Sequence, residues 1–202
     1  MTTTDSATDP PTVLVVDDDR QLADMYQFQL ADEYAVRTAY SGRQAIESLD
    51  ESVDVMLLDR RMPRLNGTTV LDRVRASEYD CRVVMTTAVD PAFDIIELPF
   101  DDYLCKPVSK ATLRQAVAQQ LIASEYGQTA RLLFRKLSKL TLLEAEHTET
   151  ALAQSTKYQQ LKRETTAIRT EATSALDEFD AFESAFSAID RSTMWDGQRV
   201  QI

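Results

Sequence analysis

The feature that most constrains the fold is an alternation of short apolar runs with amphipathic stretches, which begins at Thr12 and ends near Glu125. The apolar runs, rich in β-branched residues, are VLVV (13–16), YAVRTA (34–39), VDVMLL (53–58), RVVMT (82–86) and DYLC (102–105). Helical patterns separate them at 19–32, 42–50, 67–77 and 109–124, with a short one at 92–97. Because this alternation is typical of a parallel sheet covered on both faces, we predict an open, doubly wound α/β domain with five strands over residues 12–125.

After Gly127 the pattern changes to helices alone. Residues 131–146 are amphipathic, and a second helix is predicted over 157–189. Its apolar positions follow the 3-4 spacing of a coiled-coil seam: Tyr158, Leu161, Thr165, Ile168, Ala172, Ala175, Phe179, Phe182, Phe186 and Ile189. Small residues in the middle of the seam favour a helical hairpin or a dimer over a long rod. We therefore predict an all-α module over 127–190, a disordered tail over 1–11 and a frayed tail over 191–202.

Charge and composition limit the function. The net charge is −11, of which −10 lies before Gly127, so the first domain is a poor candidate for binding nucleic acid. No apolar run approaches the ~20 residues of a membrane span, and the first residues do not resemble a signal peptide. We expect a cytoplasmic protein without membrane contact. The two cysteines lack the spacing of a metal site.

Chemically active side chains stand at the ends of four predicted strands. Asp17 and Asp18 follow the first strand, Asp59 ends the third, Thr87 ends the fourth and Lys106 follows the fifth. Parallel strands bring their carboxyl ends to one edge of the sheet, so we expect these residues to meet. The three carboxylates can supply oxygen ligands to Mg²⁺. Thr87 and Lys106 can donate to the oxygens of a transferred phosphoryl group.

This set of residues resembles the receiver domain of two-component response regulators, which has a flavodoxin-like fold, over residues 12–125. The match includes Met62-Pro63, Gly67 and Lys106-Pro107. The resemblance implies that Asp59 accepts a phosphoryl group from a sensor histidine kinase. It also implies that Mg²⁺ binds Asp17, Asp18, Asp59 and the backbone carbonyl of Arg61, and that Tyr103 is a switch residue. Catalysis would be limited to the protein's own phosphorylation and dephosphorylation, without an independent enzyme activity.

Two places depart from the receiver pattern. The side chain of Arg61 is either a solvated arginine or a group that reaches the phosphate and tunes dephosphorylation. Pro91 and Pro99 limit the helix between the fourth and fifth strands, which must be brief or irregular. Asp19 is interpreted as the N-cap of the first helix.

The second half resembles the HalX domain of halophilic archaea, on the segments RKLSKLTLLEAEHTETALA, YQQLKRE and LDEFDAF. We expect phosphorylation to switch protein interactions of this module, as a homodimer or with another protein through 131–189. The alternative is a transcription regulator that contacts DNA through the basic face 131–139, which carries Arg131, Arg135, Lys136 and Lys139. Without a DNA-binding motif, that face is more simply interpreted as solvated. His147, the one histidine, is interpreted as a solvated helical residue.

Overall fold

The computed structural model describes residues 9–88 and 91–175, and its centre is a five-stranded sheet. The strand order is β2-β1-β3-β4-β5, and every pair is parallel. The strands are β1 (Thr12–Val16), β2 (Ala35–Ala39), β3 (Val53–Asp59), β4 (Arg82–Thr87) and β5 (Asp102–Cys105). The predicted five-stranded doubly wound sheet is confirmed. The strand order reverses between β1 and β3, which is where ligands bind in such sheets.

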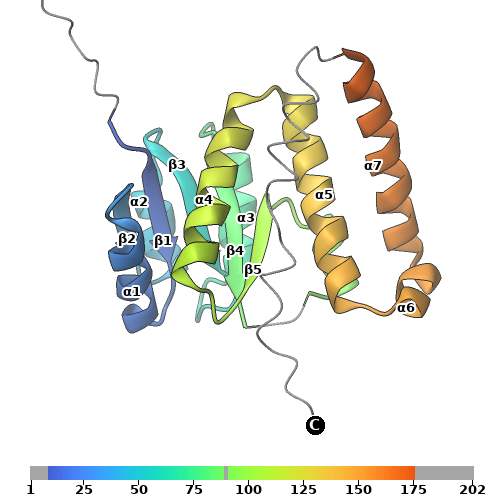
Figure 1. Cartoon of the computed structure of the whole chain (residues 1–202). Helices are drawn as coiled ribbons and strands as arrows, with labels where there is room; N and C mark the ends of the chain where they lie inside the picture. Colours follow the sequence, from blue (N-terminus) through green and yellow to red (C-terminus); the bar gives the residue numbers. More distant parts are fainter. Residues whose placement is uncertain (1–8, 89–90, 176–202) are drawn as a thin grey trace, which may run out of the picture.

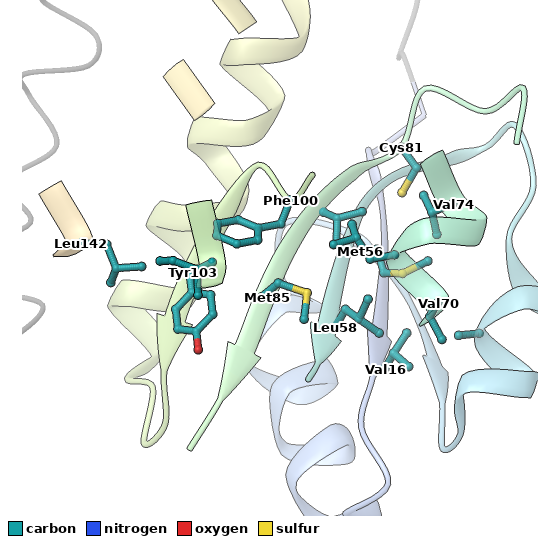
Figure 2. Packing of buried hydrophobic residues seen from close by; sticks show 14 of the residues in the cluster. Val16, Met56, Leu58, Val70, Val74, Cys81, Met85, Phe100, Tyr103 and Leu142 are labelled. Atoms are coloured by element: carbon teal, nitrogen blue, oxygen red, sulfur yellow. The ribbon is translucent and has the colours of Figure 1, made fainter. Parts of the chain in front are cut away.

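Helices cover both faces of the sheet (Figure 1). On one face lie α1 (Arg20–Leu30) and α4 (Lys110–Glu125), and on the other lie α2 (Gly42–Ser48) and α3 (Gly67–Ala76). Residues 55–58 of the central strand β3 are all apolar because both faces of the strand are buried there. Val55 and Leu57 belong to the core under α1 and α4, whereas Met56 and Leu58 belong to the core under α2 and α3 (Figure 2).

Side-chain caps fix where these four helices begin. The Oδ1 atom of Asp19 accepts hydrogen bonds from the backbone N–H groups of Gln21 and Leu22, at 3.0 and 3.3 Å. Ser41, Asn66 and Ser109 cap α2, α3 and α4 in the same way. A capping oxygen satisfies backbone donors that lack a partner in the first turn, so these sequence positions determine the helix starts. Asp19 is the N-cap, as predicted.

Between β4 and β5, the described residues form one short 3₁₀ helix, η1 (Phe93–Glu97). Pro91 and Pro99 flank it, and this confirms the prediction of a brief helix here. Arg60 is the first residue after β3, and its guanidinium pairs with the carboxylate of Asp94 in η1 at 2.6 Å. That ion pair joins η1 to the edge of the sheet where β3 ends.

Three helices follow the α/β domain in the described part of the chain, and the two long ones pack against that domain. The three helices are α5 (Gln128–Glu146), α6 (Glu149–Gln154) and α7 (Thr156–Ala175). Helix α5 contacts β5, α4 and η1, and α7 contacts α5 and η1 (Figure 1). The predicted helical hairpin is confirmed, and the short helix α6 between its two long helices was not predicted. Since β5 is an edge strand, α5 covers an edge that would otherwise be open to another chain.

The helical module shares a core with the sheet. Its buried residues in that core are Leu140, Leu142, Leu143, Leu152, Tyr158 and Leu161. Tyr103 of β5 lies next to Leu142 of α5 in this core (Figure 2). The first predicted seam residues, Tyr158, Leu161 and Thr165, are buried within the chain. The seam from Ala172 to Ile189 lies outside the side chains that the structure describes, as do the tail predicted over 191–202 and residues 1–8. Within the described residues, no helix has the length and apolar character needed to cross a bilayer.

Candidate functional site

The predicted acidic residues meet at the carboxyl edge of the sheet. Asp17 follows β1, Asp59 ends β3, and the two strands are paired neighbours. One carboxylate oxygen from each of Asp17, Asp18 and Asp59 lies within 4.8 Å of the others. Asp17 and Asp59 are 2% and 4% exposed, whereas Asp18 is open to solvent. The cluster therefore has two buried acids and one acid at its mouth.

The Lys106 ammonium joins the two buried acids. Its Nζ atom donates to Oδ2 of Asp17 at 2.7 Å and to Oδ1 of Asp59 at 2.6 Å. The backbone N–H of Lys106 donates to the carbonyl of Thr87 at 2.7 Å, and its bond to Pro107 is cis. This backbone contact fixes the base of the Lys106 side chain against the end of β4.

Backbone donors hold the second oxygen of each buried acid. The N–H of Asp19 donates to Oδ1 of Asp17 at 3.0 Å, and the N–H of Arg61 donates to Oδ2 of Asp59 at 2.7 Å. Both carboxylates are thus oriented by one ammonium and one backbone group. Fixed orientation of this kind is what a positioned nucleophile or metal ligand requires.

The electrostatics of the site favour a charged lysine and a poorly solvated acid. Burial raises the pKa of Asp59 above its ordinary value, and Lys106 acts in the opposite direction. Burial alone would lower the pKa of Lys106, but its ion pairs with Asp17 and Asp59 outweigh burial and raise it. Lys106 therefore keeps its charge, and Asp59 has lost much of the hydration that makes a carboxylate a weak nucleophile.

The donor set fits Mg²⁺. Three carboxylates against one ammonium leave a local charge of −2, which a divalent cation would offset. Hard oxygen ligands in small number, with an open side toward water, are what Mg²⁺ prefers. Arg61 lies next to the cluster through its backbone N–H, while its side chain is exposed.

Thr87 and Tyr103 are both buried, at 0% and 3% exposed. Thr87 ends β4 at the edge that carries the acids, and Tyr103 lies in β5. Burial raises the pKa of Tyr103, and a hydrogen bond with Arg60 opposes that effect. Arg60 bonds both Tyr103 and Asp94, and it was not predicted as a site residue. The one feature of the sequence that could have pointed to Arg60 is its position directly after Asp59.

The structure corrects the interpretation of His147 as solvated. His147 is the C-cap of α5, and its ring stacks on Phe93 with centroids 4.5 Å apart. Its Nε2 atom lies 2.9 Å from the carbonyl oxygen of Pro91. The histidine therefore ties the end of α5 to the segment that follows β4.

The basic face 131–139 is not a free surface. Arg131 pairs with Asp80, Arg135 with Asp101, and Lys136 with Glu164. Lys139 is 5% exposed and donates to the carbonyls of Ile96 and Leu98 at 2.8 and 2.6 Å. The interpretation as a solvated face is wrong. All four cations have partners within the chain, because α5 packs against the α/β domain and α7.

Residues 13–118 match the family model of the response regulator receiver domain, and residues 123–188 match that of the HalX domain. A Haloferax volcanii protein named "Putative transcriptional regulator" is 42% identical over 165 residues. The alignment covers 81% of this chain, and the chain spans 28% of that relative.

Solved structures agree with the family models. A signal receiver domain from Vibrio parahaemolyticus is 30% identical, with a TM-score of 0.53, over 57% of this chain and 93% of its own. A CheY-like receiver domain from Methanospirillum hungatei has a TM-score of 0.54 at 21% identity, over 57% of this chain and 97% of its own. The second similarity is one of fold.

Proposed function

We propose that this chain, which belongs to the response regulator receiver domain family and carries a HalX domain, accepts a phosphoryl group on Asp59 from a sensor histidine kinase. The observation that supports this most is the arrangement around Asp59: the Lys106 ammonium at 2.6 Å, with the carboxylates of Asp17 and Asp18 within 4.8 Å. A two-component response regulator is what the receiver domain implies. Our proposal adds three points to that: the sensor kinase as the phosphoryl donor, the requirement for Mg²⁺, and the role of each site residue.

The proposed reaction is a transfer from phosphohistidine to a carboxylate. An oxygen of Asp59 attacks phosphorus, a P–O bond forms, the P–N bond breaks, and the imidazole leaves with its electron pair. Lys106 donates to a phosphoryl oxygen in place of its present contact with Asp59, and the Thr87 hydroxyl donates to another. Bound Mg²⁺, held by Asp17, Asp18, Asp59 and the Arg61 carbonyl, would neutralise charge on the phosphoryl oxygens. Positioning and electrostatics supply the catalysis, and the protein acts on itself alone.

The test is phosphorylation of the full chain by acetyl phosphate with Mg²⁺, followed by intact mass measurement. We expect the mass to rise by one phosphoryl group, and we expect the rise to disappear in Asp59→Asn and after chelation of Mg²⁺. Asp72→Asn, an exposed acid of α3, is the matched control and should behave like the wild type. Equal phosphorylation of Asp59→Asn would place the acceptor elsewhere and contradict the proposal. The cytoplasm, where the ATP that charges a histidine kinase is found, is the proposed location.

The proposed output is a change in the protein interactions of the helical module. Tyr103 lies between the site and α5: it bonds Arg60, which follows Asp59, and it packs in the same core as Leu142. A movement of Tyr103 after phosphorylation would therefore alter the packing of α5. Partners would be a second copy of the chain or another protein.

DNA binding is the second candidate, and the name of the Haloferax volcanii relative favours it. The contacts of Arg131, Arg135, Lys136 and Lys139 within the chain do not support the face 131–139 as the DNA contact. Mobility shifts at low salt, with and without phosphorylation, test this candidate. Absence of binding at low salt would end it. Binding that persists unchanged in Lys136→Gln would point to a different surface.

A further inference from the structure

A second polar site lies at the opposite end of β4 from Thr87. It is a hollow of about 250 Å³ between the α/β domain and α5. Its wall is formed by the end of α3, the residues that lead into β4 and the first two turns of α5. The lining residues are Arg75, Asp80, Cys81, Arg82, Gln128, Arg131, Leu132 and Arg135. Nothing in the acceptor chemistry uses these residues.

Positive charge exceeds negative charge around this hollow. Four lining residues are arginines and one is an acid, Asp80, which is exposed. Asp101 is not part of the lining, but its carboxylate is 0% exposed and pairs with three of these arginines, so it is counted with them. The count is therefore +2, on a chain whose net charge is −11. A local excess of arginine on an acidic protein is the electrostatic signature of an anion site.

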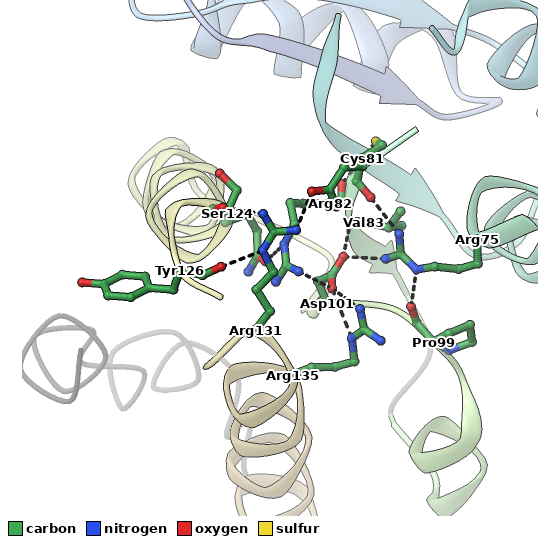
Figure 3. A network of polar contacts seen from close by, with 12 residues as sticks. Arg75, Cys81, Arg82, Val83, Pro99, Asp101, Ser124, Tyr126, Arg131 and Arg135 are labelled. Carbon is green, nitrogen blue, oxygen red and sulfur yellow. Dashed lines mark hydrogen bonds and ion pairs between the residues drawn. The ribbon is translucent and has the colours of Figure 1, made fainter. Parts of the chain in front are cut away.

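Asp101 cannot neutralise the arginines that surround it (Figure 3). Its carboxylate pairs with Arg75 at 2.5 Å, with Arg82 at 3.0 Å and with Arg135 at 2.8 Å, and it also accepts from the N–H of Val83. One negative charge thus serves three positive ones. Arg82 is 3% exposed, and burial lowers its pKa. Asp101 opposes that effect, but the nearby Arg135, Arg75 and Arg131 add to it.

The guanidinium groups of this region already donate within the chain, since Arg75 donates to the carbonyls of Pro99 and Cys81 and Arg131 donates to those of Ser124 and Tyr126. One buried donor beside them has no acceptor among the described residues. Arg82 donates through Nε and Nη2 to Oε1 of Gln120, whose own Nε2 is buried without a partner in the structure. Helix α5 begins at Gln128, and Gly127 provides no side-chain cap. The uncapped helix start adds backbone N–H groups and the positive end of a helix dipole to the wall of the hollow.

We propose that this hollow binds a small oxyanion, inorganic phosphate or the phosphate group of a small metabolite, and that the anion holds α5 on the α/β domain. Guanidinium forks match the geometry of phosphate oxygens, and a dianion would neutralise the charge of +2. Arg75, Arg82 and Asp80 come from the α/β domain, whereas Gln128, Arg131 and Arg135 come from α5. The complete site therefore exists only when α5 is docked, and a ligand that binds it stabilises that arrangement.

The test uses the full chain with Asp59→Asn and without Mg²⁺, so that phosphate at the acceptor site does not contribute. The melting temperature is measured against inorganic phosphate, with the ionic strength kept constant by potassium chloride. We expect a saturable rise. Gln128→Glu places a negative charge at the hollow without removing a contact, and an acidic residue in the first turn favours the helix. This variant should fold and show at least about a tenfold weaker response to phosphate, which corresponds to ~1.4 kcal/mol.

Arg131→Gln should weaken the response as well, and Arg43→Gln is the matched control. Arg43 lies on α2 with 86% of its side chain exposed, and its replacement removes the same charge far from the hollow. A rise that does not saturate, or that is equal in all variants, would be a general salt effect and would overturn the proposal. No rise in the parent chain would overturn it too. A rise with a DNA duplex but not with phosphate would assign the hollow to nucleic acid instead.

Discussion

At the scale of single residues, one ammonium group joins the two buried acids of the candidate site. Lys106 bonds Asp17 and Asp59, two buried acids that would otherwise repel each other. The same ammonium is the group that we expect to stabilise the transferred phosphoryl oxygens. Lys106 has a structural contact in this structure, and the proposed reaction gives it a catalytic contact as well.

Replacement of Lys106 should therefore slow phosphorylation more than it disturbs the fold. We expect Lys106→Met to lower the rate of phosphorylation by acetyl phosphate by about 10²-fold, the usual cost of losing one group that stabilises developing charge. Lys110→Met is the control, because that lysine is half exposed and pairs with Asp32. Intact mass measured over time gives both rates. An unchanged rate in Lys106→Met would contradict the role of the ammonium.

Lys139, in helix α5, should make the free energy of unfolding depend on pH. Burial lowers its pKa to about 8, with Arg135 and Lys136 acting in the same direction and Asp101 in the opposite one. In the unfolded chain the amine has its ordinary pKa of 10.5. Between these values the unfolded state binds more protons, so the free energy of unfolding should rise as the pH increases from about 8 toward 10.5.

This effect of Lys139 is measurable as a difference between two proteins. We expect the wild type to gain stability relative to Lys139→Met over that pH range, by roughly 3 kcal/mol at most. Denaturant unfolding at several pH values gives the difference. Cys81, whose burial raises its pKa to about 12, is present in both proteins and cancels. Parallel pH profiles of the two proteins would show that Lys139 titrates normally.

At the scale of elements, α3 begins in direct contact with the strand that carries Asp59. A Cβ atom at Gly67 would lie 2.1 Å from the carbonyl oxygen of Asp59 and 2.9 Å from Cα of Arg60. The N–H of Gly67 donates to the carbonyl of Arg60 at 3.0 Å. Only glycine allows α3 to start so close to the backbone of the acceptor strand.

An added methyl group at Gly67 should thus disturb both stability and the acceptor. We expect Gly67→Ala to lower the free energy of unfolding by about 1–3 kcal/mol, as overpacking commonly does, and to slow phosphorylation of Asp59. Gly127→Ala is the control, because a Cβ there meets nothing within 4 Å. Denaturant unfolding and the acetyl phosphate assay are the measurements. Equal stability of the two variants would mean that α3 moves away without cost.

At the scale of the whole molecule, the helical module packs on the receiver instead of extending from it. Helix α5 lies along β5 beside η1, and α7 packs on α5 (Figure 1). Contacts at both ends of α5 join it to the receiver: Arg131 pairs with Asp80 near the start, and His147 contacts Phe93 and Pro91 at the end. Pro91 and Phe93, which His147 contacts, belong to the segment that follows β4, and β4 ends in Thr87.

Phosphorylation should change the protection of α5 amides from hydrogen exchange. If Tyr103 and the segment after β4 rearrange, amides near Leu142 and His147 should exchange at a different rate in the phosphorylated chain. Deuterium exchange with mass spectrometry, with and without acetyl phosphate, is the measurement, and Asp59→Asn is the control. Changes confined to the loops that follow β1, β3 and β4 would show that the module does not respond. Sedimentation of the same samples reports whether the chain changes its assembly.

The sequence alone was sufficient for the α/β domain, and it also grouped the residues of the candidate site. Strand periodicity predicted all five strands, and Asp19, as an N-cap, was assigned correctly from local chemistry. Asp17, Asp18, Asp59, Thr87 and Lys106 could be grouped because parallel strands bring their carboxyl ends to one edge. These inferences depend on interactions within a strand or helix, or on a topology that a repeating pattern defines.

Only the tertiary structure decided what the second half contacts. Arg131, Arg135, Lys136 and Lys139 look like a solvated basic stripe in sequence, yet their partners lie on other elements, and His147 was misjudged for the same reason. Arg60 likewise acquires its role from Tyr103 and Asp94, which are distant in the chain. Local patterns record which face of a helix is apolar, but ion pairs between elements depend on how the elements pack. The sequence therefore determined the receiver domain and which residues stand at the carboxyl ends of its strands, and packing alone determined the docked module and the arginine-lined hollow beneath it.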